Sequence, residues 1–449
     1  MPRGPDRDRR THRLLESGFL YTISQTTSNE GECMDPLRTP SPGPSLTLHE
    51  RDRRWAMTRR FLDEHNLDGL IVAGLKSRER FELYLANDLM DGVVVFPRVG
   101  APVHLTWVPT KITGRTDAVG RERTYWIDDV RAVRLDQGIV DTLAEMRIGR
   151  GRIGVLGLAS NIPGEPHGVI PYPLWEAVSH GAPHAEFVDV WWDYAMAMLP
   201  KSAEELSLVR ESAHIGEHAC EAMQAAIFAG ARETEVYAAV MGVLYANGAV
   251  TSAPNLLMRA GTEHFTISQP AWTYDPGAAR TLKTGDLVNA EIFSIYGGLE
   301  TQQQMTVSIG APDRLHTALA SATRDAYHAG IAAIKPGATF ADIDQAMQKV
   351  VLDAGFWHIA PQVQSLNPIV LNGALCHGLD RLPDRERFRG LAPVPRTGDG
   401  VIVEGMVFAL EPNACDGPHR VTVGGSVIVT ADGVEELNHL ATNLTSVSG

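Results

Sequence analysis

The sequence predicts an α+β protein whose C-terminal part has two pseudo-symmetric halves, each a helix pair followed by sheet, around a curved antiparallel sheet. The main observation is a repeat: Gly285–Glu291 and Gly405–Glu411 each run from a glycine through a β-type segment to a glutamate six residues on. Helical patterns precede both copies. Strand-like runs separated by helical segments in the N-terminal part predict a smaller α/β domain ahead of them.

Composition describes a folded protein with more than one core. A chain of 449 residues exceeds the size of one ordinary domain, and 44% hydrophobic with 21% charged residues is typical of globular proteins. A net charge of −14 argues against a nucleic-acid partner, because phosphate binding needs clustered cations. No apolar run is long enough for a membrane helix, so no membrane partner is expected. The four cysteines lack paired metal or redox spacing, which favours a cytoplasmic location.

These patterns divide the chain into four segments. Residues 1–45 read as a disordered tail, in which residues 1–33 are either disordered or an over-extended start. Residues 46–198 form the expected α/β domain, residues 199–440 the expected catalytic domain, and residues 441–449 a short tail.

The N-terminal domain is expected to contain a mixed sheet that ends near residue 195. An amphipathic helix pattern covers residues 47–66. Short apolar runs bounded by turn residues predict strands. These runs are residues 70–73, 92–96, 103–107 and 152–156.

Two capping boxes mark helices of the C-terminal domain. Ser202 and Glu205 are spaced for a capping box at the start of the first long helix. Thr339 and Asp342 resemble one, with an aspartate in the place of the usual glutamate. The first expected helix starts after Ser202 and ends at Gly230, and the other three run from about residue 233 to 246, 313 to 334 and 339 to 355.

The repeated glutamates are the first candidates for a site. Alternation along a strand points Glu291 and Glu411 to defined sides of their sheets, so matching positions in two halves can converge. His377, which lies 34 residues before Glu411, is the candidate third member. The alternative is that both glutamates lie on solvent faces of edge strands, where charge discourages edge pairing.

Five stretches carry a resemblance to a known family. Residues 201–205, 283–286, 334–338, 405–412 and 430–433 resemble the pita-bread family of prolidases, aminopeptidase P, methionine aminopeptidases and creatinase. The resemblance implies a C-terminal pita-bread fold preceded by a creatinase-type α/β domain. It also implies hydrolysis of a C–N bond and a homodimer.

The resemblance carries a metal-ligand set only in part. Metal-dependent members use Asp, Asp, His, Glu and Glu to hold two divalent cations. The matching positions here are Glu291, Gln302, His377, Glu411 and Gly424. A neutral amide and an absent side chain cannot offset the repulsion of paired cations, so no metal and no other cofactor is expected. One ion on the three remaining groups is the alternative.

Metal-free relatives of the creatinase and ectoine-hydrolase type imply a different chemistry. They hydrolyse a C–N bond in a small nitrogenous compound, which needs a base, an acid and oxyanion donors. Glu291 and Glu411 are expected to orient and polarise a catalytic His377. Gln302 and Gln304 are expected to donate amide hydrogens to a substrate carbonyl or oxyanion.

Further candidates surround this set. The family places a histidine eleven residues before Gly285, which here is Tyr274, and His264 is expected to reach the site from the same loop. Arg381 is expected to bind a carboxylate, with a solvated loop arginine as the alternative. An apparent insertion precedes His377; if the family histidine belongs inside it, the site has no imidazole.

The sequence thus predicts a metal-independent hydrolase of a small nitrogenous or dipeptide substrate. A metal-dependent Xaa-Pro dipeptidase or aminopeptidase with a reduced site is one alternative. A pseudoenzyme that binds a ligand without turnover is another, and a lyase on the same fold is a third.

Overall fold

A computed structural model describes residues 43–449 apart from 74–80, 89, 159–169, 253, 263–267, 376, 382–383, 388–389 and 391–395. Residues 44–449 form one compact unit. The predicted N-terminal tail, apart from residues 43–45, and the candidate His264 lie outside the described residues. No helix in the described part of the chain is long and apolar enough to cross a bilayer.

The N-terminal domain is built on a six-stranded mixed sheet in the order β4-β3-β2-β1-β5-β6. Its strands are β1 (Gly69–Ala73), β2 (Gly92–Pro97), β3 (Val103–Thr106), β4 (Asp129–Ala132), β5 (Arg152–Leu156) and β6 (Glu186–Asp189). The central β1 is antiparallel to β2 and parallel to β5. Every residue of β1 and β2 is buried, as expected for apolar strands covered on both faces. The predicted mixed sheet is confirmed.

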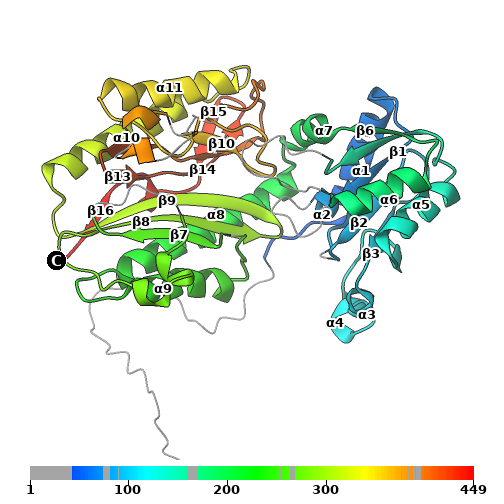
Figure 1. Cartoon of the computed structure of the whole chain (residues 1–449), viewed down its shortest axis with the longest axis horizontal. Coiled ribbons are helices and arrows are strands. Elements are labelled where there is room, and N and C mark those ends of the chain that lie inside the picture. Colours follow the sequence, from blue (N-terminus) through cyan, green and yellow to red (C-terminus); the bar gives the residue numbers. More distant parts are fainter. Residues whose placement is uncertain are drawn as a thin grey trace, which may run out of the picture. The chain divides into compact units, whose positions relative to one another are not determined.

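Helices cover this sheet (Figure 1). They are α1 (Leu48–Glu64), α2 (Phe81–Ala86), α3 (Pro109–Thr113), α4 (Ala118–Glu122), α5 (Leu135–Glu145), α6 (Tyr172–Gly181) and α7 (Trp191–Met198). Helix α2 packs on β1 and β2, and α5 packs on β2 and β3. The helix predicted over residues 47–66 corresponds to α1.

The first half of the C-terminal domain consists of two helices and a sheet. Its elements are α8 (Ala203–Ala226), α9 (Glu233–Ala246), β7 (Leu256–Ala260), η1 (Ala271–Thr273), η2 (Pro276–Ala278), β8 (Leu287–Tyr296) and β9 (Leu299–Ile309). The predicted capping box of Ser202 and Glu205 starts α8. Helix α8 packs on β8 and β9 (Figure 1). Gly297 and Gly298 both have positive φ, which the two-residue turn between β8 and β9 requires.

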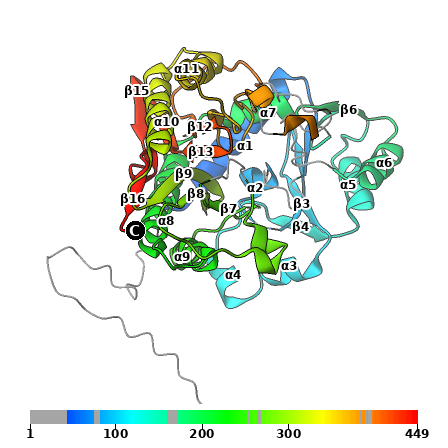
Figure 2. The same ribbon diagram turned by 60° about the vertical axis from the view of Figure 1, so that its left-hand side comes forward.

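The second half repeats this plan. Its helices are α10 (Arg314–Ala333) and α11 (Phe340–Asp353), and its short helical turns are η3 (Leu379–Arg381), η4 (Arg385–Arg387) and η5 (Leu440–Thr442). Its strands are β10 (Val363–Ser365), β11 (Val407–Leu410), β12 (Asn413–Asp416), β13 (His419–Thr422), β14 (Gly425–Thr430) and β15 (Gly433–Glu436). The predicted capping box of Thr339 and Asp342 is present in α11. Helix α10 packs on β12 and β13, and Figure 2 shows both strands beside it.

The two halves are joined along β9. The backbone N–H of Gln304 donates to the carbonyl of Gly424 at 3.0 Å. The hydroxyl of Thr306 donates to the carbonyl of Thr422 at 2.6 Å. Strand β9 of the first half therefore contacts the β13–β14 connection of the second, which brings the two repeats together.

The prediction that residues 441–449 form a tail is wrong. Residues Thr445–Val447 form β16, which pairs in parallel with Val307–Ile309 of β9. A three-residue strand of Thr, Ser and Val gives little local signal, and its partner lies more than a hundred residues earlier in the chain. Its backbone hydrogen bonds make it part of the sheet.

Candidate active site

Glu291 lies in the middle of β8, directly opposite Gln304 of β9. Both side chains are buried, with 6% and 1% of their surface exposed. Because cross-strand partners point to the same side of a sheet, the carboxylate and the amide share one face. The solvent-edge alternative is therefore wrong for Glu291.

Glu411 comes from the other half, directly after β11, and is 2% exposed. Its Oε2 accepts a hydrogen bond from Nε2 of Gln304 at 3.0 Å. Gln304 thus connects the two repeated glutamates, one as its strand partner and one as its hydrogen-bond partner. The predicted convergence of Glu291 and Glu411 is what the fold produces.

A buried cation belongs to the same cluster. Arg420 of β13 is 4% exposed, and its Nε has no hydrogen-bond partner among the described residues. Burial lowers the pKa of Arg420, while the nearby Cys415, Glu291 and Glu411 raise it. The sequence analysis missed Arg420; alternation along β13, which puts Arg420 and Thr422 on one side, was the available signal.

A small pocket opens at this cluster. Glu291, Gln304 and Arg420 line it together with Asn289 and Arg259. Its enclosed volume is about 10 Å³, room for about one water molecule, so this is a small polar hollow beside the cluster and not a preformed pocket for a whole ligand.

Gln302 is used within the protein. Its Nε2 donates to Oε1 of Glu300 at 2.7 Å, and its Oε1 accepts from Nε2 of Gln364 at 2.8 Å. Gln364 is held in turn by Asn372, whose Nδ2 donates a hydrogen bond to Oε1 of Gln364 at 3.2 Å. A side chain held at both ends is a positioning group, whereas Gln304 keeps a second amide hydrogen for a ligand.

The neighbour of Glu411 on the adjacent strand is Gln362. The backbone N–H of Glu411 donates to the carbonyl of Gln362 at 2.9 Å. The Gln362 side chain is fully buried, and its Oε1 has no partner among the described residues. Gln362 lies between Gly355 and His377, the interval in which the insertion is expected, and sequence reasoning overlooked it because an imidazole was sought there.

His377 lies beside a second histidine. Its ring stacks on that of His358 with centroids 5.6 Å apart, and its carbonyl accepts from the His358 N–H at 3.2 Å. The Nδ1 of His377 is buried without a partner among the described residues. His358 itself is locked: Nδ1–H donates to the carbonyl of Ala360 at 2.8 Å, so its Nε2 accepts from Gln348 at 3.1 Å. Burial lowers the pKa of His358 to about 4, which keeps this imidazole neutral.

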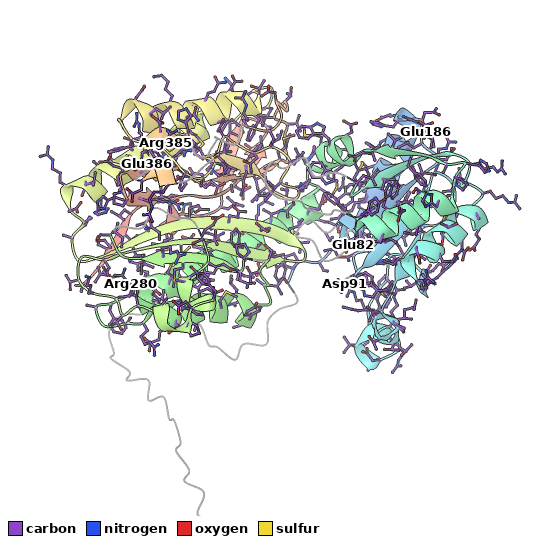
Figure 3. The ribbon with its side chains drawn as sticks, in the orientation of Figure 1. Glu82, Asp91, Glu186, Arg280, Arg385 and Glu386 are labelled. Atoms are coloured by element: carbon purple, nitrogen blue, oxygen red, sulfur yellow. The ribbon has the colours of Figure 1, made fainter. Side chains whose placement is uncertain are left out.

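The remaining candidates lie apart from the pocket lining. Tyr274 is 73% exposed at the end of η1. Arg381 donates through Nη1 to the carbonyls of Gly355 and Phe356 at 2.9 and 3.2 Å, so it caps the chain after α11. Arg385, labelled with its neighbour Glu386 in Figure 3, is exposed. These positions give no support to a ligand-binding role for Tyr274 or Arg381.

Comparison with known proteins identifies the family. The model of metallopeptidase family M24 matches residues 207–431, half of the chain, and this span contains both glutamates, Gln304 and Arg420. The chain belongs to metallopeptidase family M24. The expectation of a hydrolase that acts on a C–N bond is confirmed at the level of the family.

Individual relatives are distant. An Xaa-Pro dipeptidase of Pyrococcus horikoshii is 23% identical over 382 residues, covering 84% of this chain and 94% of that protein. Methionine aminopeptidase B of Synechocystis sp. is 28% identical over 160 residues, covering 35% of this chain and 53% of that protein.

Solved structures agree in fold. The X-Pro aminopeptidase of Thermotoga maritima superimposes with a TM-score of 0.67 at 15% identity, over 88% of this chain and 99% of that one. The prolidase of Pyrococcus horikoshii gives a TM-score of 0.64 at 17% identity, over 86% and 98%. At these identities the likeness shows the fold, and the predicted two-part α+β architecture is confirmed.

Membership of a metallopeptidase family implies a metal centre. The residues at the five ligand positions do not fit a centre with two metal ions. Gln302 offers a neutral amide that is already bonded at both ends. Gly424 offers no side chain, and a Cβ built there would lie 1.9 Å from the carbonyl oxygen of Leu410. Arg420 adds a positive charge beside the two remaining carboxylates. Two further cations in this cluster would have too few anionic donors.

The single-ion alternative also lacks its ligands. Within the part of the chain that the structure describes, no three His, Cys, Asp or Glu side chains lie close enough to hold a metal ion. Glu291, His377 and Glu411 therefore do not form such a group among the described residues.

Proposed function

We propose that this M24 protein hydrolyses a C–N bond, an amide, amidine or peptide bond, in a small substrate without a paired metal centre. The observation that carries the proposal is the buried cluster of Glu291, Gln304, Glu411 and Arg420. Its two carboxylates stand at positions where the family pattern requires metal ligands, and an amide donor and a fixed positive charge lie beside them.

The cluster supplies groups that hydrolysis needs. Glu411, oriented by Gln304, takes a proton from water as the oxygen attacks the substrate carbon. The second amide hydrogen of Gln304 donates to the oxygen that gains charge. When the C–N bond breaks, the nitrogen leaves with the electron pair and takes a proton from His377. Solvent then removes the proton from Glu411 and restores that of His377. Glu291, the cross-strand partner of Gln304, contributes a second negative charge to the site.

One observation favours a second candidate, a metal-dependent Xaa-Pro dipeptidase. The Pyrococcus horikoshii enzyme of that name matches this chain over 382 residues, nearly its whole length. A dipeptide substrate fits either proposal, because its peptide bond is a C–N bond.

One preparation separates the candidates. Metal content is measured on the purified protein, and Xaa-Pro dipeptides and a panel of ureas, guanidines and cyclic amidines are then assayed with and without chelator. Turnover of one panel member, unchanged by chelator in metal-free protein, is the expected result. Stoichiometric metal with chelator-sensitive Xaa-Pro cleavage would establish the second candidate. Specific binding without any turnover would overturn both in favour of a pseudoenzyme.

The cytoplasmic location and the homodimer stay predictions. Light scattering coupled to size exclusion measures the second directly, and a mass of one chain would contradict it.

A further inference from the structure

Arg420 is an unusual group to find buried in this position. A cation taken out of water is strongly unfavourable unless anions and hydrogen-bond acceptors surround it. Arg420 is 4% exposed, lines the pocket, and its Nε has no partner among the described residues. The described residues therefore leave the Nε–H of this buried side chain without a hydrogen-bond acceptor.

Its anionic neighbours come from both halves of the domain. Glu291 on β8 and Glu411 after β11 both stabilise the charged guanidinium. Cys415, its strand partner on β12, does so as well. The two glutamates occupy ligand positions of the family pattern, so Arg420 lies in the electrostatic field that would otherwise attract metal ions.

We propose that Arg420 is the resident cation of this site, replacing divalent metal as the charge that balances Glu291 and Glu411. Its N–H groups also donate, alongside Gln304, to the substrate oxygen that gains charge during hydrolysis. The catalytic part of this inference rests on the proposed function; the charge-balancing part does not.

The surrounding residues are consistent with this substitution. An arginine cannot lose its proton at physiological pH, so its charge is fixed and repels any approaching cation. Gly424 cannot carry a fifth ligand, because its φ of +150° and the Leu410 carbonyl leave no room for a side chain. Gln302 is neutral. The residues at positions 302, 420 and 424 are thus all consistent with a site whose positive charge comes from the protein and not from metal ions.

The alternative is a purely structural ion cluster. In that case removal of the guanidinium would destabilise β13 but would create no affinity for metal. If Arg420 substitutes for metal, its removal takes the guanidinium charge away from Glu291 and Glu411, and a divalent cation should then bind between them.

Calorimetric titration with Mn²⁺ tests this directly on the full chain. Wild-type protein should show no binding below millimolar Mn²⁺, whereas Arg420→Met should bind one ion at least tenfold more tightly. Arg420→Lys keeps the charge and should behave as wild type. Arg259→Met is the matched control, because Arg259 lines the same pocket but bonds to Ser268. Equal Mn²⁺ affinity in wild type and Arg420→Met would overturn the inference.

Two further outcomes are decisive. If Arg420→Met does not fold, Mn²⁺ added during refolding should restore its circular dichroism and a cooperative melting transition, and failure to restore them contradicts the proposal. If wild-type protein itself binds two ions tightly, both this inference and the metal-free function fail. If wild type turns over without metal but Arg420→Met gains no affinity, only this inference fails.

Discussion

The amide of Gln304 donates a 3.0 Å hydrogen bond to the carboxylate of Glu411, and this contact links the two pseudo-symmetric halves at the site. It also shows why the repeated glutamates are not equivalent. Glu291 lies on the strand beside Gln304, whereas Glu411 receives its donor from the other half.

Replacing Gln304 by methionine keeps its length and removes the donor. Hydrogen bonds to a buried charge contribute about 1.5 to 3 kcal/mol, so kcat/KM should fall by roughly 10- to 100-fold. Steady-state kinetics on the substrate found in the panel measures this. Gln303→Met is the matched control, because Gln303 is equally buried but bonds to Thr301 and Asn438 on the opposite face. An equal loss in both variants would contradict the assignment.

His377 is proposed to donate a proton to the leaving nitrogen. Substitution of His377 tests this role, with the neighbouring His358 as the control. His377→Ala should lower kcat by about 100-fold, within the range of general acid catalysis. His358→Asn serves as the control and should retain turnover, since His358 is locked by Ala360 and Gln348. Full activity of His377→Ala would remove the role.

Gly424, at the fifth ligand position, has no room for a side chain, so a substitution there should lower the stability of the fold. Gly424→Ala forces a Cβ to within 1.9 Å of the Leu410 carbonyl and requires a left-handed backbone that side chains rarely adopt. The strain should reduce the free energy of unfolding by about 3 kcal/mol or more, measured by urea denaturation. Gly433→Ala, with open space and ordinary φ, should change it by less than about 0.5 kcal/mol. A neutral Gly424→Ala would show that the position can accept a side chain.

Local patterns in the sequence predicted the framework of this site. The capping boxes at Ser202 and Thr339 act over three residues, so spacing alone locates the starts of α8 and α11. Alternation and the repeated Gly-to-Glu segment likewise located Glu291 and Glu411, because both signals are short-range.

Long-range register decided the rest. Gln362 becomes the neighbour of Glu411 only through pairing across the insertion, and Arg420 joins the cluster only when β13 packs beside β8 and β9. The parallel pairing of β16 with β9 is equally non-local. No spacing rule in one sequence encodes such contacts, which is why Gln362 and Arg420 were overlooked.

A buried ion cluster connects α1 to the start of α8. Arg54 donates to Glu50 at 2.7 Å and to Glu205 at 3.0 Å, with all three side chains at most 4% exposed. Arg54→Met should lower stability by about 3 to 5 kcal/mol, because it leaves buried carboxylates without this partner. Thermal unfolding checks this. Arg134→Met removes an exposed pair with Asp136 and should have little effect. Similar melting temperatures for the two variants would refute the distinction.

His358 should make the protein sensitive to acid. Burial holds its pKa at about 4 in the folded protein, against an ordinary value of 6.5. Between these values the unfolded chain binds a proton that the folded chain does not, so stability falls as pH drops from 6.5 to 4. The contribution is present in full above pH 6.5, and its loss over the window is about 3 kcal/mol.

Asparagine at this position keeps a donor for the Ala360 carbonyl and cannot titrate. Urea unfolding at pH 7.5 and pH 4.5 should therefore show a smaller acid loss for His358→Asn than for wild type, by about 2 to 3 kcal/mol. His184→Asn, at an exposed histidine, should keep the wild-type loss. Carboxylates that titrate in the same range act equally in all three proteins, so the difference between variants isolates the imidazole. If all three proteins lose the same free energy, the buried neutral state of His358 is not what makes the fold acid-sensitive.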